Sequence, residues 1–274
     1  MRVESYRGLV FASFSERVEP LADYLGPVMR PYIDRIFHKP IEYLGCTRQY
    51  SDSNWKLYLE NVKDPYHASL LHLFHTTFNI FRVGMKAKCI PDATHGLHSI
   101  IYVSKNDEQN SSEYKAANIR SYDDGFKLED ESILANHQEY EELTTNHIQP
   151  IFPQLVIQQI HNTLVARQLL PKGPGNFELI FHFFGYADDT PEMRKLRIKQ
   201  ANLVGPAGYI SMEDTEATEL VQQGTARDGR LTSVIEMAKD APEQDDTLIT
   251  EKLIRSFWMG YSKLMGFDAE GMAS

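Results

Sequence analysis

Cysteine is scarce in this sequence. Only Cys46 and Cys89 occur among the 274 residues, and they stand far apart in the chain. Neither a disulfide framework nor a four-cysteine metal site can be built from two such residues. We expect both to be buried thiols.

Clustered positive charge is also missing. Lys and Arg number 28 against 38 Asp and Glu, which gives a formal net charge of -10, and no basic stretch is longer than a scattered pair. Because phosphate binding needs clustered cations, a nucleic-acid partner is excluded. A small ligand or a protein partner is favoured instead.

No apolar run approaches the roughly 20 residues of a membrane span. The first 15 residues lack the charged-then-apolar pattern of a secretion signal. We therefore expect a cytoplasmic protein without a membrane segment. With 42% hydrophobic residues, a chain of this length can bury a sizeable core.

Apolar periodicity and turn residues predict an α+β fold, in which helices cover an antiparallel sheet and a long amphipathic helix ends the chain. Polar composition predicts a surface excursion or a mobile lid over 104–127 and a loop over 229–246. The stretch from 15 to 40 reads as irregular. The predicted strands cover 1–14, 41–50, 81–90, 96–104, 155–171 (with a turn near Asn162) and 177–187. The predicted helices cover 54–77 (broken at Pro65), 130–147, 191–202, 212–224 and 247–266.

Histidines and carboxylates gather between residues 60 and 75. His67, His72 and His75 lie close to Glu60 and Asp64. Imidazole and carboxylate ligands suit iron, copper, nickel or zinc rather than magnesium or calcium. On an undistorted helix His67 and His72 point about 140° apart, whereas His72 and His75 share a face. Spacing alone therefore leaves the ligand pair open, and packed histidines without a metal are the alternative.

The segment NWKLYLENVKDPYHASLLH, residues 54–72, resembles the iron-binding segment of the large (α) subunit of Rieske-type aromatic-ring-hydroxylating oxygenases. The resemblance implies a helix-grip catalytic domain (Bet v1-like or START-like) with one mononuclear Fe(II). It makes His67 and His72 the iron histidines on a distorted helix and leaves His75 to packing or to support of the site. YRGLVFASF (6–14) and NTLVARQLLPKGP (162–174) resemble further segments of the same family.

GPAGYISMEDTEATE, residues 205–219, resembles the segment that supplies the family's third iron ligand. That ligand is an aspartate in the family and maps onto Asp214, with Glu213 as the competitor. Considered without this resemblance, acidic residues at the start of a helix are explained by their favourable interaction with its positive end.

Three more residues match the iron-binding segment. The resemblance implies that Asp64 links the iron site to the Rieske cluster of a neighbouring subunit, and that Asn61 and Tyr66 line or brace the site. Read alone, Asp64 before a proline is a turn or cap residue, although three positions before His67 it could also orient that imidazole. We expect Trp55 in the core.

The family's Rieske motifs, two Cys and two His that hold a 2Fe-2S cluster, are absent from this sequence. We expect residues 1–40 to be the end of a Rieske domain with its linker, residues 41–270 to be the catalytic domain, and an upstream domain to be missing. The resemblance implies a trimer or an α3β3 assembly with a small β subunit, and electrons from NAD(P)H through a ferredoxin or reductase. This chain alone should bind iron but not turn over with a reductase.

The version DPYHASLLHLFHTTF, residues 64–78, resembles family members that act with O2 on aromatic carboxylates such as salicylate, anthranilate and terephthalate. The product would be a cis-dihydrodiol or a phenol. A carboxylate favours a bidentate Arg, for which we expect Arg167, with Arg82 and Arg255 as alternatives. Because alternate strand residues share a face, the expected pocket residues are Val156, Gln158, Ile160, Asn162, Leu164 and aromatics near Phe181.

Three other interpretations stay open. One is a metal-free module of the same fold that binds hydrophobic ligands. A second is a zinc hydrolase with two His and one carboxylate, which would need a His-Glu-x-x-His order that is absent here. The third is an inactive decoy that competes for subunits.

Overall fold

A seven-stranded antiparallel sheet forms the centre of the computed structural model, which describes residues 1–82, 84–104, 116, 125–227, 232–237 and 246–267. Its order is β3-β9-β8-β7-β6-β5-β4, so β3 and β4 are the edges. The strands are β3 Ile41–Ser51, β4 Lys86–Pro91, β5 Ser99–Ser104, β6 Thr144–Ile151, β7 Leu155–Ile160, β8 Thr163–Gly173 and β9 Asn176–Tyr186. The predicted α+β fold is confirmed.

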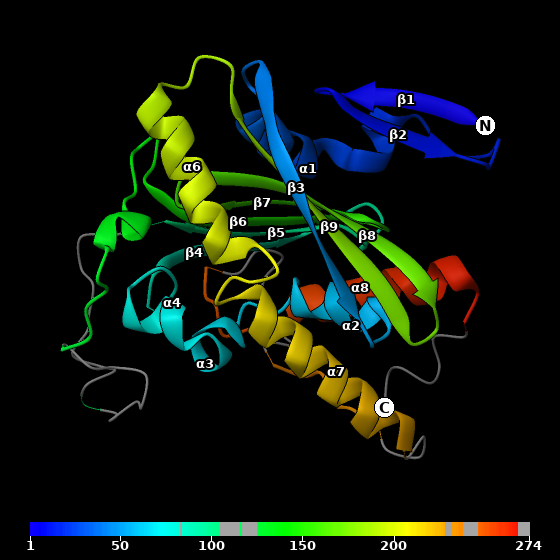
Figure 1. Cartoon of the computed structure of the whole chain (residues 1–274). Helices are drawn as coiled ribbons and strands as arrows, with labels where there is room; N and C mark the ends of the chain where they lie inside the picture. Colours follow the sequence, from blue (N-terminus) through cyan, green and yellow to red (C-terminus); the bar gives the residue numbers. More distant parts are fainter. Residues whose placement is uncertain (83, 105–115, 117–124, 228–231, 238–245, 268–274) are drawn as a thin grey trace.

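Helices lie on both faces of this sheet (Figure 1). One face carries α8 and the helices that contribute to the candidate site, and the other carries α1 and a two-stranded hairpin. The first group comprises α2 Trp55–Asn61, α3 Ala68–Leu71, α4 Leu73–Thr77, α7 Ser211–Arg227 and α8 Lys252–Met265. The remaining elements are α1 Leu21–Ile36, the hairpin β1 Arg2–Tyr6 and β2 Leu9–Ser13, the short helix η1 Glu131–Leu134, and α6 Pro191–Val204, which packs against β8 and β9.

The two faces bury separate apolar clusters. Val156, Ile160 and Val165 belong to the cluster that also contains Phe257 of α8. Ile157, Leu164 and Phe184 instead pack with Leu25 and Ile33 of α1. Alternate residues of a strand point to opposite faces, so covering both faces explains why apolar residues occupy even and odd positions of these strands and the alternation is only partial.

The first 40 residues differ from the prediction. The single strand predicted over 1–14 is a hairpin, because Arg7 and Gly8 both take positive φ values, 52° and 84°, at its turn. The stretch predicted to be irregular contains α1, despite Pro27 and Pro31. Gly26 (φ 70°) interrupts this helix, so Pro27 begins its second segment, where a missing N–H is tolerated.

The helix predicted over 130–147 is wrong. That stretch contains only the short η1, and its end forms β6, which pairs with both β5 and β7. Three polar residues of β6, namely Asn146, His147 and Gln149, are fully buried. Buried polar side chains interrupt the apolar pattern that would have identified a central strand.

Most other predicted elements are confirmed, including the turn near Asn162 and the break at Pro65. The last helix begins at Lys252, five residues later than predicted. The predicted surface excursion over 104–127 lies largely outside the described residues, and the described part of the predicted loop over 229–246 contains no helix or strand. Among the described residues, no helix is both long and apolar enough to cross a membrane.

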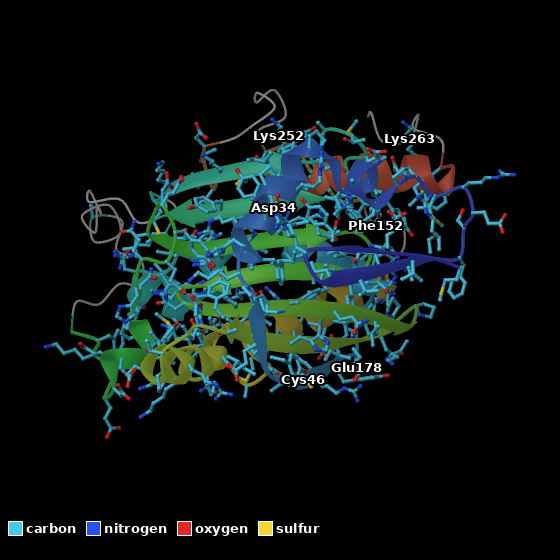
Figure 2. The ribbon with its side chains drawn as sticks, turned by 90° about the horizontal axis from the view of Figure 1, so that it is seen from above. Asp34, Cys46, Phe152, Glu178, Lys252 and Lys263 are labelled. Atoms are coloured by element: carbon cyan, nitrogen blue, oxygen red, sulfur yellow. The ribbon has the colours of Figure 1, made fainter. Side chains whose placement is uncertain are left out.

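The two cysteines differ in exposure. Cys89 is buried as predicted, but Cys46 is exposed. Cys46 lies on edge strand β3, where no further strand of the described chain covers it (Figure 2). The prediction of a buried thiol at this position is therefore wrong.

Candidate metal centre

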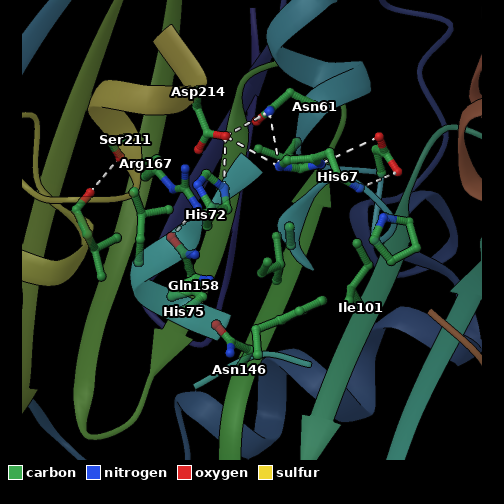
Figure 3. A pocket seen from close by; sticks show the side chains of 18 residues that line it. Asn61, His67, His72, His75, Ile101, Asn146, Gln158, Arg167, Ser211 and Asp214 are labelled. Carbon is green, nitrogen blue, oxygen red and sulfur yellow. Dashed lines mark hydrogen bonds and ion pairs between the residues drawn. The ribbon is translucent and has the colours of Figure 1, made fainter. Parts of the chain in front are cut away.

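Side chains from two distant segments of the chain converge beneath the sheet. One nitrogen or oxygen atom from each of His67, His72 and Asp214 lies within 4.8 Å of the others. Oδ1 of Asp214 is 3.1 Å from Nε2 of His72 and 3.4 Å from Nε2 of His67. Figure 3 shows the three side chains directed toward one point.

A second break in the helical segment brings the two histidines together. The prediction had one break, at Pro65, but His72 also leaves helical geometry (φ -86°, ψ 82°) between α3 and α4. This change of direction places the imidazoles of His67 and His72 with their centroids 5.2 Å apart. On a regular helix they would diverge by about 140°.

Asp214 comes from the first turn of α7, which packs against α2. Its side chain is only 7% exposed. Asn61, the last residue of α2, donates a 2.9 Å hydrogen bond from Nδ2 to Oδ1 of Asp214 and lies 3.3 Å from Nε2 of His67. The α2–α7 contact therefore fixes the acid relative to the histidines.

Each imidazole has a second carboxylate on its other nitrogen. Nδ1 of His72 is 2.8 Å from Oε2 of Glu213, and Nδ1 of His67 is 3.5 Å from Oδ2 of Asp64. The hydrogen bond with Glu213 fixes the orientation of the His72 ring and leaves its Nε2 for a metal, whereas Nδ1 of His67 has only the longer ion-pair contact with Asp64 and no hydrogen bond. Glu213, the competitor for the third position, thus lies on the far side of His72 from Asp214.

Tyr66, the other residue predicted to support the site, is not among those that line the cavity. Its backbone N–H donates to Oδ1 of Asp64 at 2.8 Å. The contribution of Tyr66 in this structure is therefore to the position of Asp64.

Electrostatics favour a bound cation. Burial alone would lower the pKa of His67, but the carboxylates of Asp214 and Asp64 raise it to about 10. Burial raises the pKa of Asp214, whereas His72 and His67 lower it more, so it stays well below its ordinary value. Asp214 is thus an anion, and protons on the imidazoles occupy the positions that a metal ion would take.

The donor set fits a transition metal. Ligand atoms about 2.1 Å from an ion and at right angles to each other lie about 3 Å apart, close to the 3.1 and 3.4 Å seen here. Two imidazole nitrogens and one carboxylate on one side leave other positions open for further ligands.

A narrow cavity extends from this centre. Its volume is only about 30 Å³. Among its lining residues are His75, Asn146, Gln158 and Arg167. Side chains must therefore shift before an aromatic ring can enter.

The predicted pocket residues divide between the two faces of the sheet. Gln158 and Arg167 line the cavity, and Val156 and Ile160 lie in the core cluster of the same face. Phe181 also belongs to that core cluster.

Two predicted pocket residues lie elsewhere. Asn162 is in the β7–β8 turn, where Nδ2 donates to the His137 carbonyl, and Leu164 belongs to the α1-side cluster. The turn pairs Ile160 with Thr163, so even positions of β7 share a face with odd positions of β8. The prediction grouped even-numbered residues on both sides of the turn, and it therefore placed Leu164 on the wrong face.

The other two arginine candidates are engaged away from the cavity. Arg82 donates from Nε to the Thr76 carbonyl at 2.7 Å, and Arg255 donates from Nη1 to the Met237 carbonyl at 2.6 Å. Neither is among the lining residues.

Sequence reasoning missed three polar lining residues, namely His75, Asn146 and Ser211. The sequence predicts a helix at Asn146 and gives His75 only a role in packing or in support of the site. Burial lowers the pKa of His75 well below its ordinary value, and nearby His72 lowers it further, so the ring is neutral. The signal that was available for His75 was its position three residues after His72.

Known proteins resemble this chain over most of its length. Residues 32–265 match the family model described as the ring hydroxylating alpha subunit (catalytic domain). The chain is 79% identical over 267 residues to the anthranilate 1,2-dioxygenase large subunit of Burkholderia cepacia, covering 97% of this chain and 63% of that protein. It is 46% identical over 270 residues to subunit alpha 2 of the terminal oxygenase component of terephthalate 1,2-dioxygenase from Comamonas sp, covering 98% of this chain and 65% of that protein.

Among solved structures, naphthalene 1,2-dioxygenase from Rhodococcus sp. bound to indole has a TM-score of 0.77 at 19% identity, with 98% of this chain and 66% of that chain covered. That likeness concerns the fold. The chain thus spans slightly less than two thirds of the length of these proteins. On the family match and the two sequence relatives, this chain belongs to the ring-hydroxylating oxygenase α-subunit catalytic-domain family.

Proposed function

We propose that this chain binds one Fe(II) through His67, His72 and Asp214 and hydroxylates an aromatic carboxylate with dioxygen, 2-aminobenzoate being the preferred substrate type. The observation that carries the proposal is the convergence of these three side chains beside a cavity that contains Arg167. The identity to an anthranilate 1,2-dioxygenase large subunit supports the choice of substrate.

Bound at these residues, ferrous iron would supply open positions at which dioxygen can bind and be activated. The protein's own part is to hold the ligands and position the ring. Glu213 keeps Nε2 of His72 directed at the site, Asp64 forms an ion pair with His67, and Asn61 holds Asp214. The small, mostly enclosed cavity excludes bulk water from the reacting atoms.

Arg167 is suited to an anionic substrate. It is only 3% exposed, and its guanidinium donates to the Tyr58 hydroxyl and to Oε1 of Gln158. No carboxylate of the described residues forms an ion pair with it, and its Nε atom has no hydrogen-bond partner there. Since a buried unpaired cation is costly, a substrate carboxylate would supply the missing counter-charge.

Electrons would come from outside this chain. Neither Cys46 nor Cys89 is part of a Rieske motif, so the 2Fe-2S cluster would be on another part of the full-length protein or on another subunit. Asp64, in contact with His67, would link that cluster to the iron. The proposed partners are a β subunit and a ferredoxin or reductase in a trimer or α3β3 assembly in the cytoplasm. The division into 1–40 and 41–270 remains part of this proposal.

Peroxide tests the proposed reaction without an external electron source. Hydrogen peroxide contains both oxygen atoms and the electrons needed to add two hydroxyls across one ring bond. Addition at C1 and C2 of 2-aminobenzoate, followed by loss of carbon dioxide and ammonia, leaves catechol. Iron-loaded protein and 18O-labelled peroxide should give doubly labelled catechol, and His72→Ala should give none. Iron-loaded protein that binds 2-aminobenzoate but forms no labelled catechol would contradict the proposed activity.

A further inference from the structure

Several polar atoms that line the cavity lack partners within the described chain. Nδ1 and Nε2 of His75 and Oδ1 of Asn146 are buried, and none of them has a hydrogen-bond partner there. The side chains are 3% and 0% exposed, respectively. Buried polar groups are almost always paired, so three such atoms in one cavity indicate that a ligand group meets them there.

The orientation of the Asn146 amide is fixed by its surroundings. Its Nδ2 donates to the backbone carbonyl of Ile80 at 3.1 Å. Because a carbonyl can only accept, the amide nitrogen must face Ile80 and Oδ1 must be the other terminal atom. The free atom of Asn146 is therefore a hydrogen-bond acceptor, and a hydrogen-bond donor is needed to pair with it.

The His75 ring is held by its neighbours and not by hydrogen bonds. It stacks on Phe81 with centroids 6.2 Å apart and meets the edge of His72 at 5.2 Å. No carboxylate of the described residues contacts it, so the imidazole is neutral and has one donor and one acceptor nitrogen. It can accept from a ligand while its second nitrogen donates to the same ligand or to water.

Four separate elements bring these groups to one cavity. His75 is on α4 and Asn146 on β6, while Gln158 and Arg167 are on the neighbouring strands β7 and β8. In Figure 3 they surround the space beside His72, away from Asn61. The cavity thus has one cationic position and a separate position with two free acceptors.

We propose that His75 and Asn146 form a subsite for a hydrogen-bond-donating ring substituent, an amino or hydroxyl group next to the carboxylate that Arg167 holds. This inference rests on the proposed function. An aromatic acid with a donor at that position satisfies the buried acceptors. One without it leaves them unpaired, and such sites discriminate strongly against analogues that lack the polar group.

The test is a comparison of two ligands of similar shape on the iron-loaded protein. 2-Aminobenzoate has a hydrogen-bond-donating amino group where 2-methylbenzoate has a methyl group. 2-Hydroxybenzoate, with a hydroxyl group at that position, is the second acid with a donor. Dissociation constants by titration calorimetry should favour both donor acids over 2-methylbenzoate by about tenfold or more. His75→Phe and Asn146→Leu should each reduce that ratio severalfold and leave the affinity for 2-methylbenzoate unchanged or improved.

Binding of 2-methylbenzoate shows that each variant is folded, so the ratio remains interpretable. Ile101→Val, at an apolar lining residue, is the matched control and should preserve the ratio. Unchanged ratios in both His75→Phe and Asn146→Leu would overturn the subsite while leaving the proposed function standing. Wild-type protein that binds no aromatic acid would overturn both.

Discussion

Nδ1 of His72 lies 2.8 Å from Oε2 of Glu213, on the opposite side of the imidazole from Asp214. Consecutive acidic residues of α7 therefore hold the same ring from its two nitrogens. Only Asp214 is placed to share an ion with His67, and Glu213 orients the ring.

Glu213→Ala should weaken iron binding by roughly 10- to 100-fold without abolishing it, because an orienting carboxylate is lost but the ligand remains. Competition with a chelator under anaerobic conditions measures the change. Glu216→Ala, at an exposed residue of the same helix, should have no effect. Complete loss of iron in Glu213→Ala would instead make Glu213 a direct ligand.

Arg167→Leu should weaken binding of 2-aminobenzoate and benzoate by roughly 10- to 100-fold, the usual value of hydrogen bonds to a charged group. Aniline, which has no carboxylate, should bind the variant as well as it binds wild type. Arg48→Leu on the edge strand is the control, since the Arg48 side chain is 67% exposed. Equal losses for aniline and benzoate would mean that Arg167 acts only through packing.

Stability should fall in acid because of His98. Burial lowers its pKa to about 4, and the neutral ring is fully used, since Nε2 lies 3.0 Å from the Tyr24 carbonyl and Nδ1 accepts from the Phe152 N–H at 3.0 Å. Between pH 6.5, the ordinary pKa of histidine, and about pH 4, this residue is protonated in the unfolded chain and neutral in the folded chain. The contribution of His98 to the free energy of unfolding is therefore fully present above pH 6.5 and is lost as pH falls toward 4.

The loss due to His98 should be on the order of 3 kcal/mol across that range. Between pH 7 and pH 5, urea unfolding of wild type should show about 2 kcal/mol of this loss, and His98→Phe should flatten the slope. His38→Phe, at an exposed residue, should leave the pH slope unchanged. A pH slope that persists unchanged in His98→Phe would assign the acid sensitivity to other groups.

Arg197 should be a strong structural residue. Its fully buried guanidinium pairs with Glu139 and Asp189, which tie α6 to the segment before β6 and to the end of β9. Arg197→Met leaves two largely buried carboxylates unpaired and should cost about 3–5 kcal/mol in urea unfolding. Arg194→Met on the same helix breaks a half-exposed pair with Glu42 and should cost less than about 1 kcal/mol. Similar costs for the two variants would contradict this difference.

The fold class could be predicted from local apolar patterns. The residues that converge at the site were predicted from the resemblance to a known family, because spacing alone left the ligand pair open. Alternating apolar positions identified β7, β8 and β9, and the 54–72 segment identified His67 and His72. The helix break at His72 could not be predicted, since no proline or glycine marks it.

The residues that line the cavity away from the candidate iron ligands could not be predicted for a different reason. Asn146 lies on a central strand whose buried polar residues break the expected apolar pattern. Leu164 was placed on the wrong face because the two-residue turn at 161–162 changes which positions align. Pocket lining thus depends on strand register, which the composition of a single strand does not contain.

Metal analysis of anaerobically purified protein tests the central claim most directly. Wild type should contain about one iron atom per chain, whereas His72→Ala and Asp214→Ala should contain almost none, and exposed Glu216→Ala should match wild type. Zinc at equal levels in wild type and variants, or a wild type without any bound metal, would contradict the account.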